Sequence, residues 1–415
     1  MATVPYQKLK LACYMGNVSM AAIGCLSPLL FVTFREMYGI SYTLLGLLVV
    51  INFCTQLTVD LIFAYHASRF NVERTVKLTP LLTVAGLMIY GLLPTLVPQC
   101  AYLFLALGTV VFSAAAGLSE VLLSPVIAAI PSKTPERDMS ILHSTYAWGL
   151  VVVVIFSTLF LKWVGAERWF LLPLVMVAIP AASFLLFLSE VLPPMEQGTE
   201  TPEQGSRFPK GLWLCVLCIF LGGAAEGTMT QWISSYLESA VELTKAVGDI
   251  LGMAMFSAAL GLGRSLYAKL GKRVLSVIQW GMGGAAVCYV VAALSSNAVI
   301  GLVACVLTGL CVSMLWPGSI ILVGERFPTI GVTAYALMAA GGDLGCSAAP
   351  QLVGLVADGV AASQWAAALS QSLSHTAEQI GMRAGILAAA IFPLVGVFFL
   401  IYLRRFFRDD SAGKK

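Results

Sequence analysis

Charge is scarce in this sequence. Charged residues make up 11% of its 415 residues, whereas soluble domains carry about 25%. Histidine occurs only three times, and the net charge is only +3. Binding of nucleic acid needs a strongly basic surface, so no nucleic-acid partner is expected. The sequence also lacks a nucleotide-binding loop, a complete set of metal ligands and a nucleophile–base motif. We therefore expect no cofactor, no metal and no enzymatic activity.

The ten cysteines do not change this expectation. Only Cys215 and Cys218 have the spacing of a metal-binding or redox pair, and no second pair completes a site. Both lie inside the apolar run GLWLCVLCIFL, where cysteine behaves as a small apolar residue.

Apolar residues dominate instead, at 59% of the chain, and the mean hydropathy is +0.89. A membrane-spanning helix needs about 20 mostly apolar residues. Twelve segments meet this requirement: 9–34, 43–66, 77–97, 101–130, 140–163, 168–189, 211–237, 247–268, 273–295, 298–324, 331–357 and 380–403. The sequence therefore predicts an all-α membrane protein with twelve transmembrane helices.

One long polar stretch divides these segments into six and six. Residues 191–210, VLPPMEQGTETPEQGSRFPK, contain four prolines and two glycines and predict a cytoplasmic linker. We expect an N-terminal six-helix bundle over 1–190, a C-terminal bundle over 211–405 and a short tail over 406–415. The N-terminus leads into the first apolar segment without a small-residue cleavage site, so we interpret it as a retained helix.

Basic residues indicate the orientation, because cytoplasmic loops are enriched in Lys and Arg. With the N-terminus inside, only five of the 24 fall on the outer side: Arg35, Lys162, Arg168, Lys245 and Arg383. The sequence thus predicts a multi-pass protein of the cell membrane, surrounded by the lipid bilayer, with both termini cytoplasmic. Trp163 and Trp169, at the outer ends of their segments, fit the aromatic belt at the membrane surface. Nothing requires more than a monomer.

Acidic residues inside the spans are the strongest functional signal. Glu120, Glu226 and Asp343 fall near the middle of apolar segments, and Asp60 falls near the cytoplasmic end of its segment. No Lys or Arg is expected at mid-span to neutralise the first three. A charge there costs at least about 3 kcal/mol, and such acids often carry protons. They favour a polar cavity between two helix bundles, where transporters bind their solutes.

Structural explanations remain open for each acid. Glu120 would then be a protonated group that is hydrogen-bonded to a neighbouring helix, and Glu226 would also have a structural role. Asp343 has small neighbours and would bond to the backbone. However, the segment around Glu226 also contains Gln231 and Trp232, a mixture of polar and aromatic side chains that is unusual for a lipid-facing helix.

Ring-shaped solutes stack on aromatic side chains while polar groups read their hydroxyls. Trp148, Trp232 and Trp316 lie inside spans and are candidate walls of a binding site. His143 begins the fifth segment on the cytoplasmic side, and Asn17 is the polar amide of the first. Packing alone explains the tryptophans, and a structural role explains His143, equally well at this stage.

These segments resemble the major facilitator superfamily, and within it the fucose permease-like group of proton–sugar symporters. Glu120 is followed by Pro125, like the group's Glu-x-x-x-x-Pro motif, whose Glu is coupled to protonation. Residues 313–328, SMLWPGSIILVGERFP, are similar to the family's Ser-Ile-Met-Phe-Pro segment. The eleventh segment shows the family's pattern of small residues, proline and acid at Gly341, Gly342, Pro350, Gly354 and Asp358.

Two short basic loops, HASRFNVERTVK and YAKLGKRVLS, resemble the superfamily's loop signature at the cytoplasmic face. The resemblance implies a cytoplasmic gate at Arg69, Arg264 and Lys272. Ser68 and Ala268 stand where the signature has an acid, so such a gate should be weaker here. Fucose-type permeases also carry an acid in the first helix; this chain has none there, which argues against fucose itself.

We therefore expect a secondary active transporter that takes up a sugar or similar polar solute with a proton, by alternating access. Glu120 would carry the proton. The solute would contact Glu226, Gln231, Trp232, Trp316, Asp343, Asn17, His143 and Trp148. The alternative is a proton-coupled efflux antiporter, although the fifth segment has one Gly and no Pro where efflux members are Gly- and Pro-rich. The solute, the coupling ion and the direction of coupling stay open.

Overall fold

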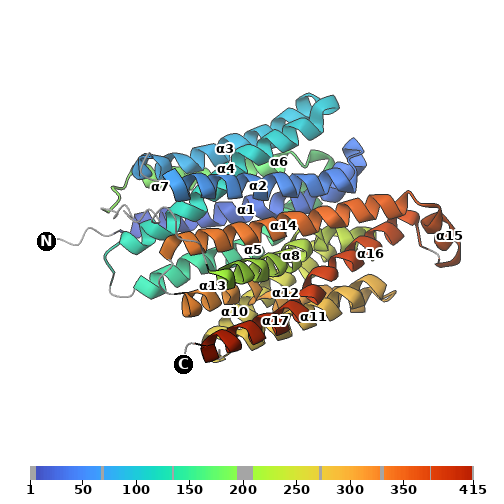
Figure 1. Cartoon of the computed structure of the whole chain (residues 1–415). Coiled ribbons are helices and arrows are strands. Elements are labelled where there is room, and N and C mark those ends of the chain that lie inside the picture. The colour runs from blue at the N-terminus through green and yellow to red at the C-terminus, as the bar shows by residue number, and fades with distance from the viewer. Residues whose placement is uncertain are drawn as a thin grey trace. The chain divides into compact units, whose positions relative to one another are not determined.

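The computed structural model describes residues 6–66, 70–132, 135–193, 209–270, 273–327, 331–373 and 375–413. This part of the chain is helical and contains no strand (Figure 1). It has twelve helical stretches that are long and apolar enough to cross a membrane. The twelve-span, all-α prediction is confirmed.

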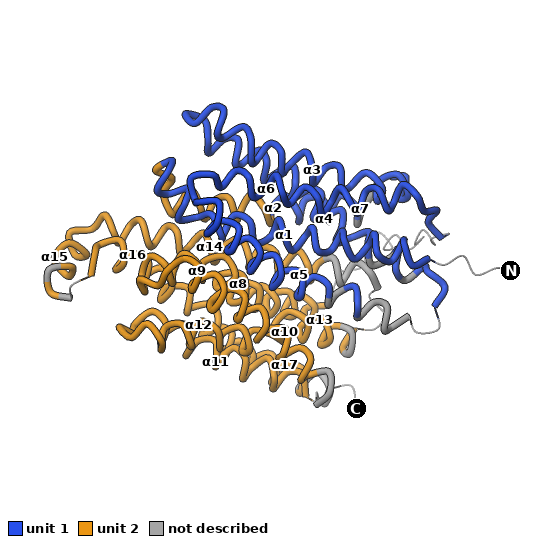
Figure 2. Tube along the Cα trace, turned by 180° about the vertical axis from the view of Figure 1, so that it is seen from behind, with its two compact units in different colours: residues 1–38, 54–201 blue, residues 39–53, 202–415 orange. Residues whose placement is uncertain are grey.

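The chain forms two compact units (Figure 2). Unit 1 comprises residues 1–38 and 54–201, and unit 2 comprises residues 39–53 and 202–415. Unit 1 contains α1 (Gln7–Tyr38), the second half of α2 (Tyr42–His66), α3 (Val72–Leu96), α4 (Ala101–Ala129), α5 (Pro135–Val164), α6 (Leu171–Met176) and α7 (Ala178–Leu188).

Unit 2 contains the first half of α2 and all later helices. These are α8 (Lys210–Ser239), α9 (Lys245–Val247), a π-helical segment (Gly248–Ala254), α10 (Met255–Leu270), α11 (Val274–Leu294), α12 (Ala298–Val312), α13 (Leu315–Arg326), α14 (Gly331–Ala361), α15 (Gln364–Leu373), α16 (Ala377–Ala389) and α17 (Ile391–Gly413).

Aromatic rings gather inside unit 1. The ring of Trp169 meets Phe34 edge-on, with 4.9 Å between the ring centroids, and lies 6.3 Å from the ring of Tyr90. Trp169 is fully buried, whereas Trp163 is 87% exposed. The interpretation of both tryptophans as belt residues is therefore wrong for Trp169, which packs in the core instead.

Small residues bring α8 and α14 together in unit 2. A Cβ atom on Gly223 of α8 would lie 2.5 Å from the carbonyl oxygen of Gly342 on α14. Only glycine allows the two backbones to approach this closely, as in other helix pairs of membrane proteins. Gly342 directly precedes Asp343, so this contact also fixes the position of Asp343 relative to α8.

The first half of α2 is anchored on α14. The carboxylate of Asp358 accepts hydrogen bonds from the backbone N–H groups of Tyr42 and Thr43, at 3.2 and 2.6 Å. The hydroxyl of Tyr42 donates to Glu378 at 2.7 Å. A carboxylate suits this place, because the first N–H groups of a helix have no partner within the helix and carry partial positive charge.

Three segments expected to be single helices are divided in the structure: 168–189 into α6 and α7, 298–324 into α12 and α13, and 380–403 into α16 and α17. In each case a proline is the third residue of the second helix: Pro180, Pro317 and Pro393. Proline has no N–H, so it cannot bond to the carbonyl four residues before it, and the helix breaks at that point.

Candidate functional site

Two acids of unit 1 lie on neighbouring helices. Gly117 of α4 faces α2, and a Cβ atom there would lie 3.1 Å from the carbonyl oxygen of Gln56 and 3.1 Å from Val59. Glu120 follows Gly117 by three residues and Asp60 follows Gln56 by four, so each stays on the same face of its helix. The carboxylates of Asp60 and Glu120 are close enough for their charges to interact. These two acids, expected at different depths, lie near each other.

The environments of these two acids differ. Asp60 is 7% exposed, and its Oδ1 has no hydrogen-bond partner in the part of the chain that the structure describes. Glu120 is exposed. Asp60 was not among the predicted site residues. In the structure it lies as far from the start of α2 as Glu120 lies from the start of α4, to within one residue.

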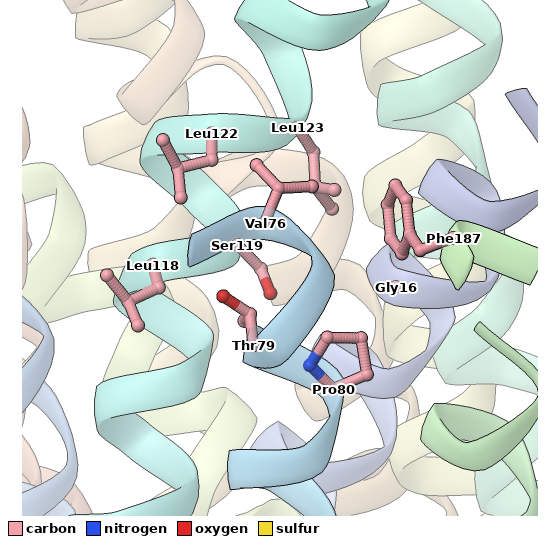
Figure 3. A pocket seen from close by; sticks show the side chains of 9 residues that line it. All are labelled: Gly16, Val76, Thr79, Pro80, Leu118, Ser119, Leu122, Leu123 and Phe187. Carbon is pink, nitrogen blue, oxygen red and sulfur yellow. The ribbon is translucent and has the colours of Figure 1, made fainter. Parts of the chain in front are cut away.

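A small void lies between α1, α3, α4 and α7 (Figure 3). Its volume is about 10 Å³, close to the minimum for one water molecule. In Figure 3 the side chains of Thr79 and Ser119 point toward each other across it. Ser119 directly precedes Glu120. A larger groove of about 600 Å³ is lined by residues of α2, α3 and α4, Arg74 among them, and shares Thr79 and Leu118 with the void.

The second candidate cluster is in unit 2 and centres on an ion pair. Arg264 of α10 donates from Nη2 to Glu226 of α8, at 3.1 Å to Oε1 and 3.5 Å to Oε2. Both residues lie within the candidate membrane spans. The expectation that no basic residue neutralises Glu226 is therefore wrong. Arg264, expected at a cytoplasmic gate, instead reaches a residue halfway along α8.

A proline supplies the second partner of Arg264. Pro317 cannot bond to the carbonyl of Ser313, which lies four residues before it. That carbonyl accepts a hydrogen bond from Arg264 Nε at 3.1 Å. The break between α12 and α13 thus provides a backbone acceptor inside the span, and the guanidinium group is held between this carbonyl and Glu226.

Two further candidate residues, Trp316 and Asp343, lie on helices next to this ion pair. Trp316 follows Ser313 by three residues. A Cβ atom on Gly342 would overlap the ring of Trp316, so the ring lies against α14 next to Asp343. Trp316 is partly exposed, and Asp343 is 7% exposed. Both come from helices that border Glu226, since Leu315 also contacts Gly222 on α8.

Trp232 and Gln231, expected to contact the solute, differ in their surroundings. Trp232 is fully buried, its Nε1 donates to the carbonyl of Pro350 at 3.0 Å, and its ring meets Tyr42 edge-on. It therefore offers no free face to a solute in this conformation. Gln231 is 6% exposed, and its amide has no hydrogen bond within the described residues.

The remaining predicted residues do not join either cluster. Asn17 donates to the carbonyl of Leu142 at 2.6 Å and so ties α1 to α5. Trp148 is 66% exposed on α5. His143 is within α5, but its side chain lies outside the described part of the structure. Arg69 and Lys272 lie outside the described residues.

These clusters place titratable and charged groups inside the candidate spans. Among the described residues, no group of three or more His, Cys, Asp or Glu side chains could hold a metal ion. Glu120 and Asp60 offer carboxyl groups that can exchange a proton, and Arg264 with Glu226 offers a charged pair inside a span. Neither arrangement contains a nucleophile with an adjacent base.

The comparisons with known proteins agree with this description. Residues 12–350 match the family model described as Major Facilitator Superfamily. No curated protein matches the sequence. Among solved structures, a bacterial homologue of the human lysosomal transporter Spinster, in an inward-facing and occupied conformation, aligns over 97% of both chains with a TM-score of 0.76 and 14% identity.

Two sugar transporters of E. coli are also similar in structure. The xylose transporter XylE, in an inward-open conformation, aligns over 92% of this chain and 94% of its own, with a TM-score of 0.69 and 15% identity. The fucose:proton symporter FucP aligns over 96% and 99%, with a TM-score of 0.60 and 13% identity. At these identities the likeness concerns the fold. Together with the family match over most of its length, it places the chain as a transporter in the Major Facilitator Superfamily.

Proposed function

We propose that this transporter takes up a small polar solute, such as a sugar or a related compound, together with a proton, by alternating access. The proton binds at Glu120. The observation that carries the proposal is the close packing of α4 on α2 at Gly117, which brings Asp60 and Glu120 near each other on two membrane-spanning helices.

Electrostatics supports a proton at this place. Two neighbouring carboxylates repel each other, and a charge inside the membrane is costly, so the pair is most stable when it holds a proton. Glu120 is exposed and Asp60 is buried. We therefore assign proton exchange to Glu120, and we assign to Asp60 the role of the neighbouring charge that favours the bound proton.

The nature of the structural neighbours supports the solute class. FucP is a fucose:proton symporter and XylE is a xylose transporter. The distribution of basic residues supports a location in the cell membrane with both termini in the cytoplasm. We further propose that the protein works as a monomer. Solute contacts come from the cluster of Glu226, Gln231, Trp316 and Asp343.

The test uses purified full-length protein in liposomes. A thermal-shift screen of sugars, sugar acids and nucleosides first identifies a solute. Glu120→Gln should then abolish uptake driven by a proton gradient, because the side chain no longer binds and releases a proton, but it should spare exchange of labelled for unlabelled solute. Glu167→Gln, which removes an exposed carboxylate from the turn before α6, should leave both activities intact. Uphill uptake by Glu120→Gln at the wild-type rate would reject the assignment.

A further inference from the structure

Arg264 is a cation inside a membrane span with part of its hydrogen-bonding capacity unused. The guanidinium group of arginine carries five N–H donors in a planar fork that fits a carboxylate through two nitrogens. Here one nitrogen, Nη2, serves both oxygens of Glu226, and Nε serves the carbonyl of Ser313. Nη1 has no partner among the residues that the structure describes. The side chain of Arg264 is 37% exposed.

These features distinguish Arg264 from a purely structural arginine of the same unit. Arg383 donates from Nη1 to the carbonyls of Ala293 and Ser295, at 3.3 and 2.6 Å, and from Nη2 to the carbonyl of Ala240 at 2.9 Å. Both of its outer nitrogens are used by the backbone. Arg264, in contrast, keeps the edge formed by Nη1 and Nη2 available to an acceptor from outside the protein.

We infer that Arg264 binds an acidic group of the transported solute through this edge, so that the transporter selects anionic polar solutes such as sugar acids. The inference rests on the proposed function, in which the chain moves a small polar solute. A guanidinium group prefers carboxylate or phosphate oxygens, with which it forms short, charge-assisted hydrogen bonds. A neutral sugar offers only hydroxyl groups, which cannot compete with the carboxylate that Arg264 already contacts.

Glu226 acts as an internal competitor at this site. It shares Nη2 with any incoming carboxylate, and its negative charge repels a second anion. It also keeps Arg264 neutralised inside the span when no solute is bound, which lowers the cost of a charge there. The Ser313 carbonyl and Pro317 keep the guanidinium group in place while its anionic partner changes, because the Nε bond involves neither carboxylate.

The geometry around the pair suits a solute of modest size. Trp316 lies against α14 beside Asp343 and is partly exposed, so its ring offers an apolar surface next to the charged group. Gln231 lies on α8 five residues after Glu226, and its amide makes no hydrogen bond within the described residues. A sugar acid has all three matching features. Its acidic group would bind Arg264, its ring would pack on Trp316, and its hydroxyls would form hydrogen bonds with the amide of Gln231.

The test compares acids with their neutral counterparts on purified full-length protein. Binding is measured by thermal shift and by isothermal titration, with D-glucuronate against D-glucose, D-galacturonate against D-galactose, and L-lactate against glycerol. At least one acid should bind to the wild type, and its neutral partner should not. Glu226→Gln should bind the same acid several-fold more tightly, because the competing charge is gone. Arg264→Gln should lose about ten- to a hundredfold in affinity, the range for a charge-assisted hydrogen bond.

Arg264→Lys, which keeps the charge but not the fork, should fall between the wild type and Arg264→Gln. Arg404→Gln removes an arginine whose described contact is Ser276 at the end of the bundle, and it should bind like the wild type. Equal binding of the neutral sugar, an acid preference that survives Arg264→Gln, or failure of every acid to bind Glu226→Gln would each overturn the inference. If Arg264→Gln does not fold, the affinity of Glu226→Gln decides the question.

These outcomes are separate from those of the proton assignment. Acid binding is an equilibrium measurement without a membrane gradient, so it does not require Glu120 to be the proton carrier. Conversely, loss of uphill uptake in Glu120→Gln would stand even if the solute were neutral.

Discussion

Replacing Arg264 by glutamine removes the positive charge that faces Glu226 and leaves this carboxylate unpaired inside a membrane span. Breaking a fully buried ion pair by removing one partner costs about 3–5 kcal/mol. The side chains here are 37% and 20% exposed, for Arg264 and Glu226 respectively, so part of the charge remains solvated. We expect a loss of about 1–2 kcal/mol for Arg264→Gln, allowing for that exposure.

The double variant separates the ion pair from the other contacts of Arg264. In Arg264→Gln with Glu226→Gln, no unpaired charge remains, and two amides face each other. If the unpaired carboxylate is the main cost, the double variant should be more stable than Arg264→Gln alone, with a coupling energy of about 1 kcal/mol or more between the two positions.

The measurement is the temperature at which each purified variant loses its monodisperse peak on size-exclusion chromatography after heating, since a transporter of this size does not unfold in a reversible two-state transition. The variants are then compared by rank. Arg264→Gln should be the least stable of the four proteins. A double variant that is less stable than Arg264→Gln alone would contradict the ion pair described above.

Two further predictions concern other parts of the molecule. Asp60→Asn should weaken proton-driven uptake as Glu120→Gln does, although less completely, because it removes the neighbour and not the proton carrier; wild-type uptake in a proton-gradient assay would show that Asp60 is only structural. Gly223→Ala should lower thermal stability by about 1–3 kcal/mol through overpacking, because its new Cβ would lie 2.5 Å from the carbonyl oxygen of Gly342. Gly261→Ala on α10, where nothing lies within 4 Å of the added atom, is the control and should be neutral or stabilising.

The number of spans was predictable because it depends on local composition. A helix must be apolar over about 20 residues to cross a bilayer whatever its neighbours are, and this requirement can be read one segment at a time. The breaks inside three spans were not predicted, because proline alone does not decide them: Pro180, Pro317 and Pro393 lie at breaks, whereas Pro28 and Pro350 lie inside continuous helices. Packing roles were harder to predict. Trp169 sits at the end of an apolar segment like Trp163, and only the fold shows that Phe34 and Tyr90 surround it.

The pairing of Glu226 with Arg264 could not be read from local sequence, because the two residues are 38 positions apart on different helices. Near the end of an apolar segment, an arginine ordinarily extends along the helix to reach water. Arg264 bonds inward instead, and the reason lies on a third helix. The carbonyl of Ser313 is available only because of Pro317, and it accepts the bond from Nε that turns the guanidinium group toward Glu226.

The same proline therefore links the sequence motif to the site. The Trp-Pro pair at residues 316 and 317 was recognised from its resemblance to a family segment, and only Trp316 was given a physical role, as a candidate wall of the binding site. In the structure, Pro317 interrupts the helix and frees one carbonyl, while Trp316 places a ring beside Asp343 on the next helix. A backbone acceptor inside a span is costly if it stays unsatisfied. Arg264 satisfies it and in turn needs an anion, which Glu226 provides in this structure. The break before α13 is therefore satisfied by the cation Arg264 on α10, which is in turn neutralised by the carboxylate of Glu226 on α8. Because this cation is needed inside the span, the middle of unit 2 is a place where an anionic solute can bind.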